Sequence, residues 1–459
     1  MESVSFLVYN DIKRIKRGKK MKYVMYNIIK LKESIECDNL NNRCRKNEKD
    51  FSRNRKLIPK DLILYTLNNR GKTTKMELDD FIQEYNIDEV STPALLKQRE
   101  KLNEDIFKEL NKESLIRFYG EFPQEVKTYK GNILGAIDGS DCEVPNTEKT
   151  RERYKSINSK DDDRVARIKL SNCYDVINGY VLDTEIAEYK HGEMDLAIKH
   201  IKSTNYITEY FPIIYVMDRG YFSLAAMYHF INEGTKFIIR LNKNYLKTEQ
   251  KSMKYDDEIV KIKYQYDRIR NYKDKDEEFY NYYENGNTIS LRFVNIKLST
   301  GEIETIMTNI SEDELSSEDI NEIYQLRWGI ETNYHELKES MQVTNISSSK
   351  DTIIKQEIYS QMAVCNIIRS IANELNPQIN QDKYKYQMKV NFNIAVGFVK
   401  RFLLKILIEK DNKKRKELCE VLFNNILKNL IPIRDGRKYP RDKNKKLSNK
   451  HPINKRKSI

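Results

Sequence analysis

Hydrophobic and polar residues change their spacing along this chain, and the change separates two helical ends from a central region that contains strands. In the first 130 residues, apolar positions recur at helical spacing in DLILYTLNN after Pro59 and in ALLKQREKLNEDIFKEL after Ser91. Proline is favoured at the first position of a helix, and serine is favoured as its cap. The pattern therefore predicts a helical, basic region over residues 1–130.

The spacing becomes typical of strands between residues 131 and 241. An apolar run ends at Asp138 before a Gly-Ser pair, which indicates a buried strand that runs into a turn. A second apolar run ends in the same way at Asp218, and Asn178-Gly179 indicates a hairpin turn between two other strands. The predicted strands are 132–137, 164–175, 180–187, 211–217 and 236–241, with helices at 191–203 and 223–234.

The rest of the chain predicts three further parts. Residues 242–309 are rich in tyrosine and charge and favour β-structure, including a hairpin formed by TISLRFVNIKL and EIETIMTNI. Residues 310–375 contain a helix that Ser316-Ser317 could cap, and residues 376–459 are helical before a basic tail. The fold class is therefore α/β, with a β-rich insertion in the core and helical regions at both ends.

One segment, YQLRWGIETNYHELK, combines two helical faces of opposite character. At about 100° per residue, four polar residues fall within roughly 60° of one another on one face: Tyr324, Arg327, Glu331 and Lys338. Four apolar residues lie on another face that suits core packing: Leu326, Ile330, Leu337 and Met341. The pattern indicates a helix held by the protein on one side that presents an acid, two cations and a phenol on the other.

Composition narrows the class of protein. Charged residues make up 33% of the 459, the mean hydropathy is −0.74, and no apolar run reaches the roughly 18 residues of a membrane helix. The amino-terminal basic run follows a short apolar stretch, the reverse of a secretory signal. The six cysteines are scattered without a Cys-x-x-Cys pair, which favours reduced thiols in a cytoplasm over a zinc site.

The net charge of +13 is concentrated at the two ends of the chain. Residues 1–60 contain 17 Lys and Arg against 7 Asp and Glu, and residues 431–459 contain 11 against 2. The region between them is therefore slightly acidic. Basic ends favour contact with a polyanion such as nucleic acid. The alternative is that the lysine-rich ends only aid solubility.

Three carboxylates are the candidate chemical groups. Asp138 and Asp218 each close an apolar strand, and Glu331 lies on the charged helix face. A carboxylate at the end of a buried strand is costly unless it is paired or binds a metal, although either aspartate alone could be a turn residue or helix cap. Three carboxylates without partner histidines favour Mg²⁺ or Mn²⁺. Two such ions about 3.5–4 Å apart can activate a hydroxyl and stabilise a leaving phosphodiester oxygen.

These motifs resemble those of bacterial DDE transposases of the insertion-sequence-four family. The order of predicted elements, with acids on the first and fourth strands, is similar to a ribonuclease-H-like fold. The family signature Tyr-x₂-Arg-x₃-Glu-x₆-Lys is matched at every spacing. The segments IDGSDCEVPNT and YVMDRGYFS resemble the two aspartate blocks, and the resemblance extends from about residue 50 to 375.

The resemblance implies a function and a role for each site residue. Asp138, Asp218 and Glu331 would bind two Mg²⁺ or Mn²⁺ ions, cut double-stranded DNA at the ends of an element, and join the 3′-hydroxyls to target DNA. Arg327 and Lys338 would contact phosphates, and Tyr324 would contact DNA. The alternatives are an ordinary helix ion pair for Lys338 and core packing for Tyr324. A homodimer on DNA in the bacterial cytoplasm or nucleoid is implied, with no membrane contact.

The aromatic residues depart from the family pattern. Some members cut the second strand through a hairpin and stack a flipped base on tryptophan in the insertion, whereas this chain has only Trp328, inside the signature. Trp328 is expected in the core; the alternative is that it forms a platform for a base. Four other aromatic residues could supply a stacking face: Tyr264, Tyr266, Tyr272 and Phe293.

Two rival functions remain open at this point. The first is another metal-dependent nuclease of the same fold, which would cut DNA without joining ends. The second is a domesticated DNA-binding protein without catalysis, which the three intact acids argue against. No nucleotide-binding loop is present in the sequence, so no nucleotide energy source is implied.

Overall fold

This computed structural model describes residues 22–53, 55–155, 165–297 and 301–433. The chain divides into two compact units, each built from separate stretches of sequence. Unit 1 comprises Met1–Glu125, Glu143–Arg167 and Glu336–Ile459, and unit 2 comprises Val126–Cys142 and Ile168–His335. The predicted basic tail beyond residue 433 and the first 21 residues lie outside the described residues. The five-part division made from the sequence stays a prediction.

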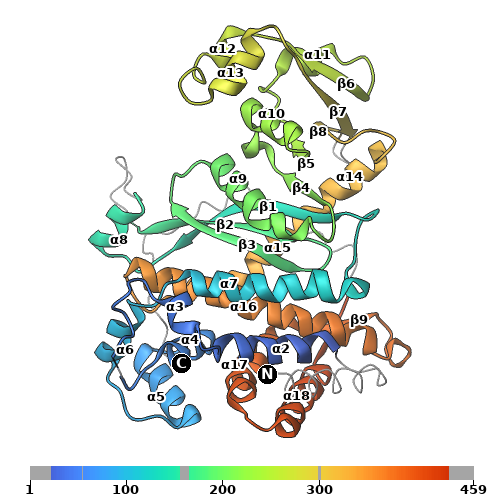
Figure 1. Ribbon diagram of the computed structural model, residues 1–459. Coiled ribbons are helices and arrows are strands. Elements are labelled where there is room, and N and C mark those ends of the chain that lie inside the picture. The colour runs from blue at the N-terminus through green and yellow to red at the C-terminus, as the bar shows by residue number, and fades with distance from the viewer. Residues whose placement is uncertain (1–21, 54, 156–164, 298–300, 434–459) are drawn as a thin grey trace. The chain divides into compact units, whose positions relative to one another are not determined.

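Unit 1 is mainly helical, as the pattern at both ends of the chain predicts. The 25-residue helix α16 (Asp351–Leu375) packs against α2, α4, α7 and α17, and most of its side chains are buried (Figure 1). The helices and strands of this unit are α2 (Lys22–Ile35), α3 (Leu40–Cys44), α4 (Pro59–Leu67), α5 (Thr74–Tyr85), α6 (Thr92–Arg99), α7 (Asp105–Ile116), α8 (Glu148–Arg153), α17 (Phe392–Ile408), α18 (Asn412–Leu427), β9 (Met388–Val390) and β10 (Leu430–Pro432).

The segment after Ser91 forms two helices, α6 and α7, where the sequence pattern predicts one. Tertiary hydrogen bonds replace the helical ones at the break. The side-chain amide of Gln356 donates to the carbonyl oxygens of Arg99 and Leu102, and the Asn103 amide donates to the Cys44 carbonyl. Arg99 is 1% exposed and forms an ion pair of 3.0 Å with the buried carboxylate of Glu357. A buried network therefore fixes the end of α6 on α16.

Unit 2 is built on an eight-stranded sheet with the order β3-β2-β1-β4-β5-β8-β7-β6. Strands β1, β4 and β5 run parallel, whereas the pairs β2–β3, β5–β8, β7–β8 and β6–β7 are antiparallel. The bounds are β1 (Ile133–Glu143), β2 (Arg167–Asp175), β3 (Tyr180–Glu188), β4 (Ile213–Met217), β5 (Lys236–Arg240), β6 (Asp257–Ile262), β7 (Ile289–Lys297) and β8 (Ile303–Thr308). The prediction of a mixed α/β fold is confirmed.

The segment 242–309 is less rich in strands than its sequence suggests. It contains three short helices and β6, while β7 and β8 extend the main sheet next to β5. The predicted hairpin is confirmed as the antiparallel pair β7–β8. The helices of unit 2 are α9 (Glu193–Thr204), α10 (Leu224–Asn232), α11 (Lys247–Ser252), α12 (Tyr266–Ile269), α13 (Glu277–Glu284), α14 (Ser317–Leu326) and α15 (Trp328–His335).

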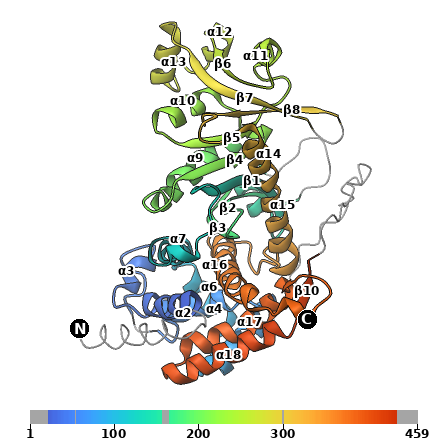
Figure 2. The ribbon, with the colours of Figure 1, turned by 90° about the vertical axis from the view of Figure 1, so that its right-hand side faces the viewer.

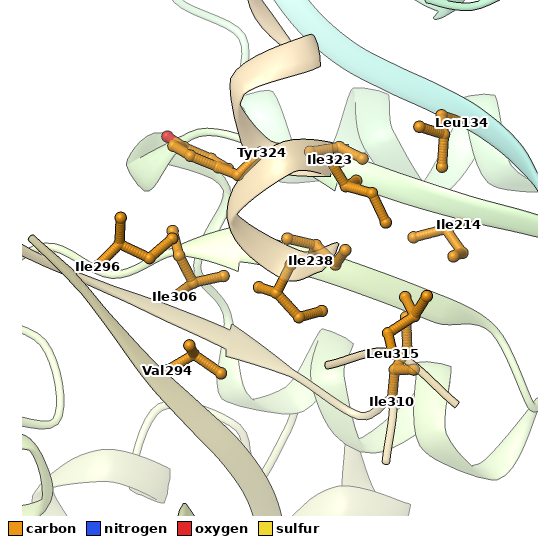
Figure 3. Packing of buried hydrophobic residues seen from close by; sticks show 12 residues of the cluster. Leu134, Ile214, Ile238, Val294, Ile296, Ile306, Ile310, Leu315, Ile323 and Tyr324 are labelled. Carbon is orange, nitrogen blue, oxygen red and sulfur yellow. The ribbon is translucent and has the colours of Figure 1, made fainter. Parts of the chain in front are cut away.

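A continuous apolar cluster holds α14 on this sheet (Figure 3). The sheet contributes Leu134, Ile214, Val216, Ile238, Val294, Ile296 and Ile306, and α14 contributes Ile320, Ile323 and Tyr324. The Ser316 hydroxyl caps α14 by accepting from the Asp319 amide, as predicted. Packing of one helix face across β1, β4, β5, β7 and β8 thus sets the direction in which the signature segment continues.

The described helices include none that is long and apolar enough to cross a membrane.

Candidate active site

Strand pairing brings Asp138 and Asp218 together in unit 2. The last residues paired between the parallel strands β1 and β4 are Ile137 and Met217, and each aspartate is the next residue in the chain. Neighbouring strands lie about 4.8 Å apart, so the two aspartates are near neighbours at one edge of the sheet. Asp218 directly follows β4 and precedes a 3₁₀ turn, as predicted, but Asp138 lies within β1.

The predicted turn after Asp138 is wrong, because β1 continues to Glu143. Strand β2 borders β1 on the side opposite β4, so β1 still has a neighbouring strand after β4 has ended at Met217. The carbonyl oxygen of Asp138 accepts hydrogen bonds from the Tyr334 hydroxyl at 2.6 Å and the Ser171 hydroxyl at 3.2 Å. These bonds fix the backbone that carries the first candidate acid.

Burial and neighbouring negative charge raise the pKa of Asp138 to about 6. Burial is the largest cause, and the carboxylates of Glu331 and Glu193 add to it. The Gly139 amide and the Arg327 guanidinium act in the opposite direction. Because the Asp138 carboxylate is partly desolvated and lies near two other carboxylates, a positive charge bound beside it would stabilise the folded chain.

The Asp218 carboxylate accepts a hydrogen bond from a tyrosine hydroxyl and lies near an arginine. The Tyr324 hydroxyl donates to Oδ1 of Asp218 at 3.0 Å, and Nη1 of Arg240 lies 3.8 Å from the same oxygen. Arg240 ends β5, where the register pairs Met217 with Ile239 and places Arg240 beside Asp218. Sequence reasoning missed Arg240, although a third apolar run that ends in a charged residue was a usable signal.

The signature segment is not the single helix that its spacing predicts. Helix α14 ends at Leu326 and α15 begins at Trp328 (Figure 2). A π-helical turn, Glu336–Ser340, follows. At the break, the Arg327 amide donates to Tyr324 and the Ile330 amide to Arg327, both three residues back. This tighter bonding turns the chain at Arg327. Lys338 lies in the π-helical turn, within unit 1.

Arg327 is a buried cation next to the candidate acids. It is 3% exposed, and its Nη2 lies 3.6 Å from Oε1 of Glu331. Its guanidinium also lies 5.4 Å from the ring centroids of Tyr324 and Trp328. Among the described residues, its Nε has no hydrogen-bond partner. The structure therefore gathers the first three signature residues and both aspartates in one unit.

Comparison with known protein families identifies the family of this chain. Residues 129–367, more than half of the chain, match the family model described as the transposase DDE domain. The chain belongs to this transposase family. The matched residues include Asp138, Asp218 and the whole signature, so the resemblance drawn from the signature is confirmed, and with it the transposase function.

The transposase is also similar to individual proteins. It is 20% identical over 321 residues to the transposase InsG of insertion sequence element IS4 from Escherichia coli (strain K12), covering 69% of this chain and 68% of that protein. A solved structure that it resembles is the piggyBac transposase synaptic complex with hairpin DNA. That match has a TM-score of 0.41 and 10% identity, and it covers 87% of this chain and 85% of that one.

Two side chains of the signature segment are more exposed than expected, one aromatic and one aliphatic. Trp328 is 49% exposed, so its predicted place in the core is wrong; the next residue, Gly329, faces the sheet near Val176, and Trp328 points elsewhere. Leu326 is 38% exposed, whereas the other members of the predicted apolar face are buried: Ile330, Leu337 and Met341. The Tyr324 ring packs in the apolar cluster, and its predicted DNA contact stays a prediction.

The candidate stacking residues differ in exposure. Phe293 is fully buried, which excludes it as a stacking face. Tyr264 and Tyr266 are 40% and 60% exposed, whereas the half-buried ring of Tyr272 packs 5.2 Å from Phe279. Tyr264 and Tyr266 thus remain the accessible members of the set.

The donor chemistry of the site fits a hard divalent cation. All three candidate ligands are carboxylates, and Asp138 lies where added positive charge relieves repulsion from its neighbours. Within the described part of the chain, no three His, Cys, Asp or Glu side chains converge closely enough to hold one ion as they stand. The backbone places the acids together, and their side chains must turn toward one another to form a closed ligand set.

Proposed function

We propose that this transposase cuts DNA at the ends of an insertion sequence in a divalent-cation-dependent reaction and joins the freed 3′-hydroxyls to target DNA. The observation that carries the proposal is the placement of Asp138 and Asp218 at neighbouring positions of parallel strands β1 and β4. The nearby charge of Glu331 supports a third ligand. The strand order β3-β2-β1-β4-β5 supports assignment to the ribonuclease-H-like class.

In this proposal, Asp138, Asp218 and Glu331 hold Mg²⁺ or Mn²⁺, most simply as two ions. Bound ions of this kind activate a water or 3′-hydroxyl as nucleophile and stabilise the leaving oxygen of the phosphodiester. The Tyr324 hydroxyl orients Asp218 through its 3.0 Å hydrogen bond. Arg327 neutralises the acids through its ion pair with Glu331 before DNA arrives, and its guanidinium would contact a phosphate near the cut.

The remaining signature residue and the basic ends complete the proposed DNA contacts. Lys338 would bind a phosphate near the cut, and the lysine-rich ends would neutralise DNA farther from it. Because two element ends must be held at once, we propose a homodimer on double-stranded DNA. A DNA substrate of this kind places its action in the bacterial cytoplasm, at the nucleoid.

The test uses the full chain and double-stranded DNA that carries the inverted repeats flanking its gene. With Mg²⁺, the protein should cut at the repeat ends and form strand-transfer products with a target plasmid. Asp138→Asn, Asp218→Asn and Glu331→Gln should each abolish cutting while DNA binding persists. Asp195→Asn, which changes a largely exposed carboxylate on α9, is the matched control and should cut normally. Cutting without any joined product would support a nuclease instead.

A further inference from the structure

A fourth carboxylate borders both candidate aspartates, outside the signature. Glu193 is the first residue of α9, and its Oε2 lies against Gly220, two residues after Asp218, where it occupies the space that a methyl group would need. The other oxygen, Oε1, lies 3.8 Å from the point that a methyl group on Gly139, next to Asp138, would occupy. The carboxylate therefore lies beside the backbone that follows each aspartate.

The fold holds this side chain in place from two directions. Helix α9 packs against the 3₁₀ turn Arg219–Tyr221, which begins directly after Asp218. The hydroxyl of Tyr221, a residue that is 1% exposed, lies 3.8 Å from the same point beside Gly139 that Glu193 approaches. The first turn of α9 is thus fixed where β1 and β4 present their acids.

An ordinary ion pair does not account for this position. Lys169 on β2 is the cation that faces Glu193, and its Nζ lies 3.9 Å from that carboxylate but 2.9 Å from Asp141. Asp141 therefore already neutralises Lys169 at the shorter distance. Glu193 is left with a long contact to that cation and a close approach to Gly220, which only a residue without a side chain permits.

We propose that Glu193 is a further oxygen ligand of the divalent cation that Asp138 binds. The inference rests on the metal-dependent function proposed above and extends its ligand set to an acid from α9. Mg²⁺ and Mn²⁺ take several oxygen ligands, so an additional carboxylate beside Asp138 completes a coordination sphere that the other acids leave open. The absence of a side chain at Gly220 then leaves room for this carboxylate.

The test is Mn²⁺ binding to the full chain, measured by titration calorimetry without DNA. Glu193→Gln should weaken Mn²⁺ binding roughly tenfold or more, the effect expected when a ligand group is lost. Asp195→Asn removes the same charge two residues along α9 and should leave Mn²⁺ affinity within about twofold. Its side chain is 69% exposed, and the atoms nearest Gly139 and Gly220 belong to other residues.

Gly220→Ala is the second variant, and it displaces the carboxylate without removing it. Gly220 does not have a positive φ, so alanine suits its backbone, and the group in its way is the end of a flexible side chain. Its melting temperature should therefore stay close to wild type while Mn²⁺ affinity falls. Unchanged affinity in both Glu193→Gln and Gly220→Ala would overturn the ligand role and leave only the ion pair with Lys169.

Asp138→Asn separates this inference from the function on which it rests. If Asp138→Asn loses Mn²⁺ binding but Glu193→Gln does not, the role of Glu193 as a ligand is refuted, and the proposed site of three carboxylates is retained. If Asp138→Asn binds Mn²⁺ like wild type, the metal site itself is refuted. Loss of binding in both variants, with the Asp195→Asn control intact, supports the full set.

Discussion

Replacing Asp138 with asparagine should stabilise the metal-free protein while it abolishes DNA cleavage. The carboxylate is partly desolvated and lies near the charges of Glu331 and Glu193, so its ionised form is disfavoured in the folded chain. Asparagine has nearly the same shape and no charge. The substitution therefore relieves the repulsion and at the same time removes a proposed metal ligand.

The size of the expected gain in stability follows from the pKa of Asp138. A rise from 3.8 to about 6 corresponds to about 3 kcal/mol between the charged and neutral forms. Because the folded pKa is the higher one, the cost is fully present above about pH 6 and disappears as the pH falls toward 3.8. The Asp138→Asn substitution should therefore raise the stability of unit 2 by up to about 3 kcal/mol at pH 8, and by roughly half as much at pH 5.

Thermal unfolding in EDTA at pH 8 and pH 5 measures this difference. For a unit of this size, about 1 kcal/mol shifts the melting temperature by roughly 2–4 °C. Addition of Mg²⁺ at pH 8 should raise the melting temperature of wild type only, since ligand binding stabilises the folded state. Asp141→Asn, on the same strand but 43% exposed, is the control and should not stabilise. The prediction is refuted if Asp138→Asn melts below wild type at pH 8, or if the difference between their melting temperatures does not narrow at pH 5.

Three other changes test separate parts of the molecule. Tyr324→Phe keeps the ring in the core but removes the donor to Asp218, so it should cost about 1 kcal/mol and slow cleavage roughly tenfold or more; unchanged rates in a cleavage time course contradict this. Arg99→Met leaves Glu357 buried without its cation, and thermal unfolding should show a loss of about 3–5 kcal/mol that Glu357→Gln partly restores. Deletion of residues 434–459 should weaken binding to all DNA sequences and flatten its salt dependence; an equal slope would mean that the tail does not contact phosphates.

The sequence was sufficient for features that depend on local spacing. Apolar runs that end in an acid predicted β4 and placed Asp138 and Asp218 on separate strands, and the Asn178-Gly179 turn predicted the β2–β3 hairpin. These features follow from side-chain periodicity and from backbone angles that particular residues favour. The fold class of the sheet region could therefore be predicted.

Features that depend on distant contacts could not be predicted in this way. The signature segment breaks at Arg327, between α14 and α15, and an ideal helical arc misplaced Leu326 at that break. The exposure of Trp328 was likewise not predicted. The position of Glu193 depends on the packing of α9, which leaves no periodic signal. The apolar run of β5 signals a charged residue at its end, but only the strand register places Arg240 beside Asp218. The two helices α6 and α7 are separated by hydrogen bonds from Gln356, more than 250 residues away.

The division of the chain into two interleaved units has a consequence for its synthesis. The chain passes from one unit to the other four times, after Glu125, Cys142, Arg167 and His335. Unit 2 is complete only once residue 335 has left the ribosome, and unit 1 needs α16 beyond that point. A gene copy with a premature stop codon in its first two-thirds therefore yields neither unit. We expect such a copy to produce an incompletely folded chain and not a partially active enzyme.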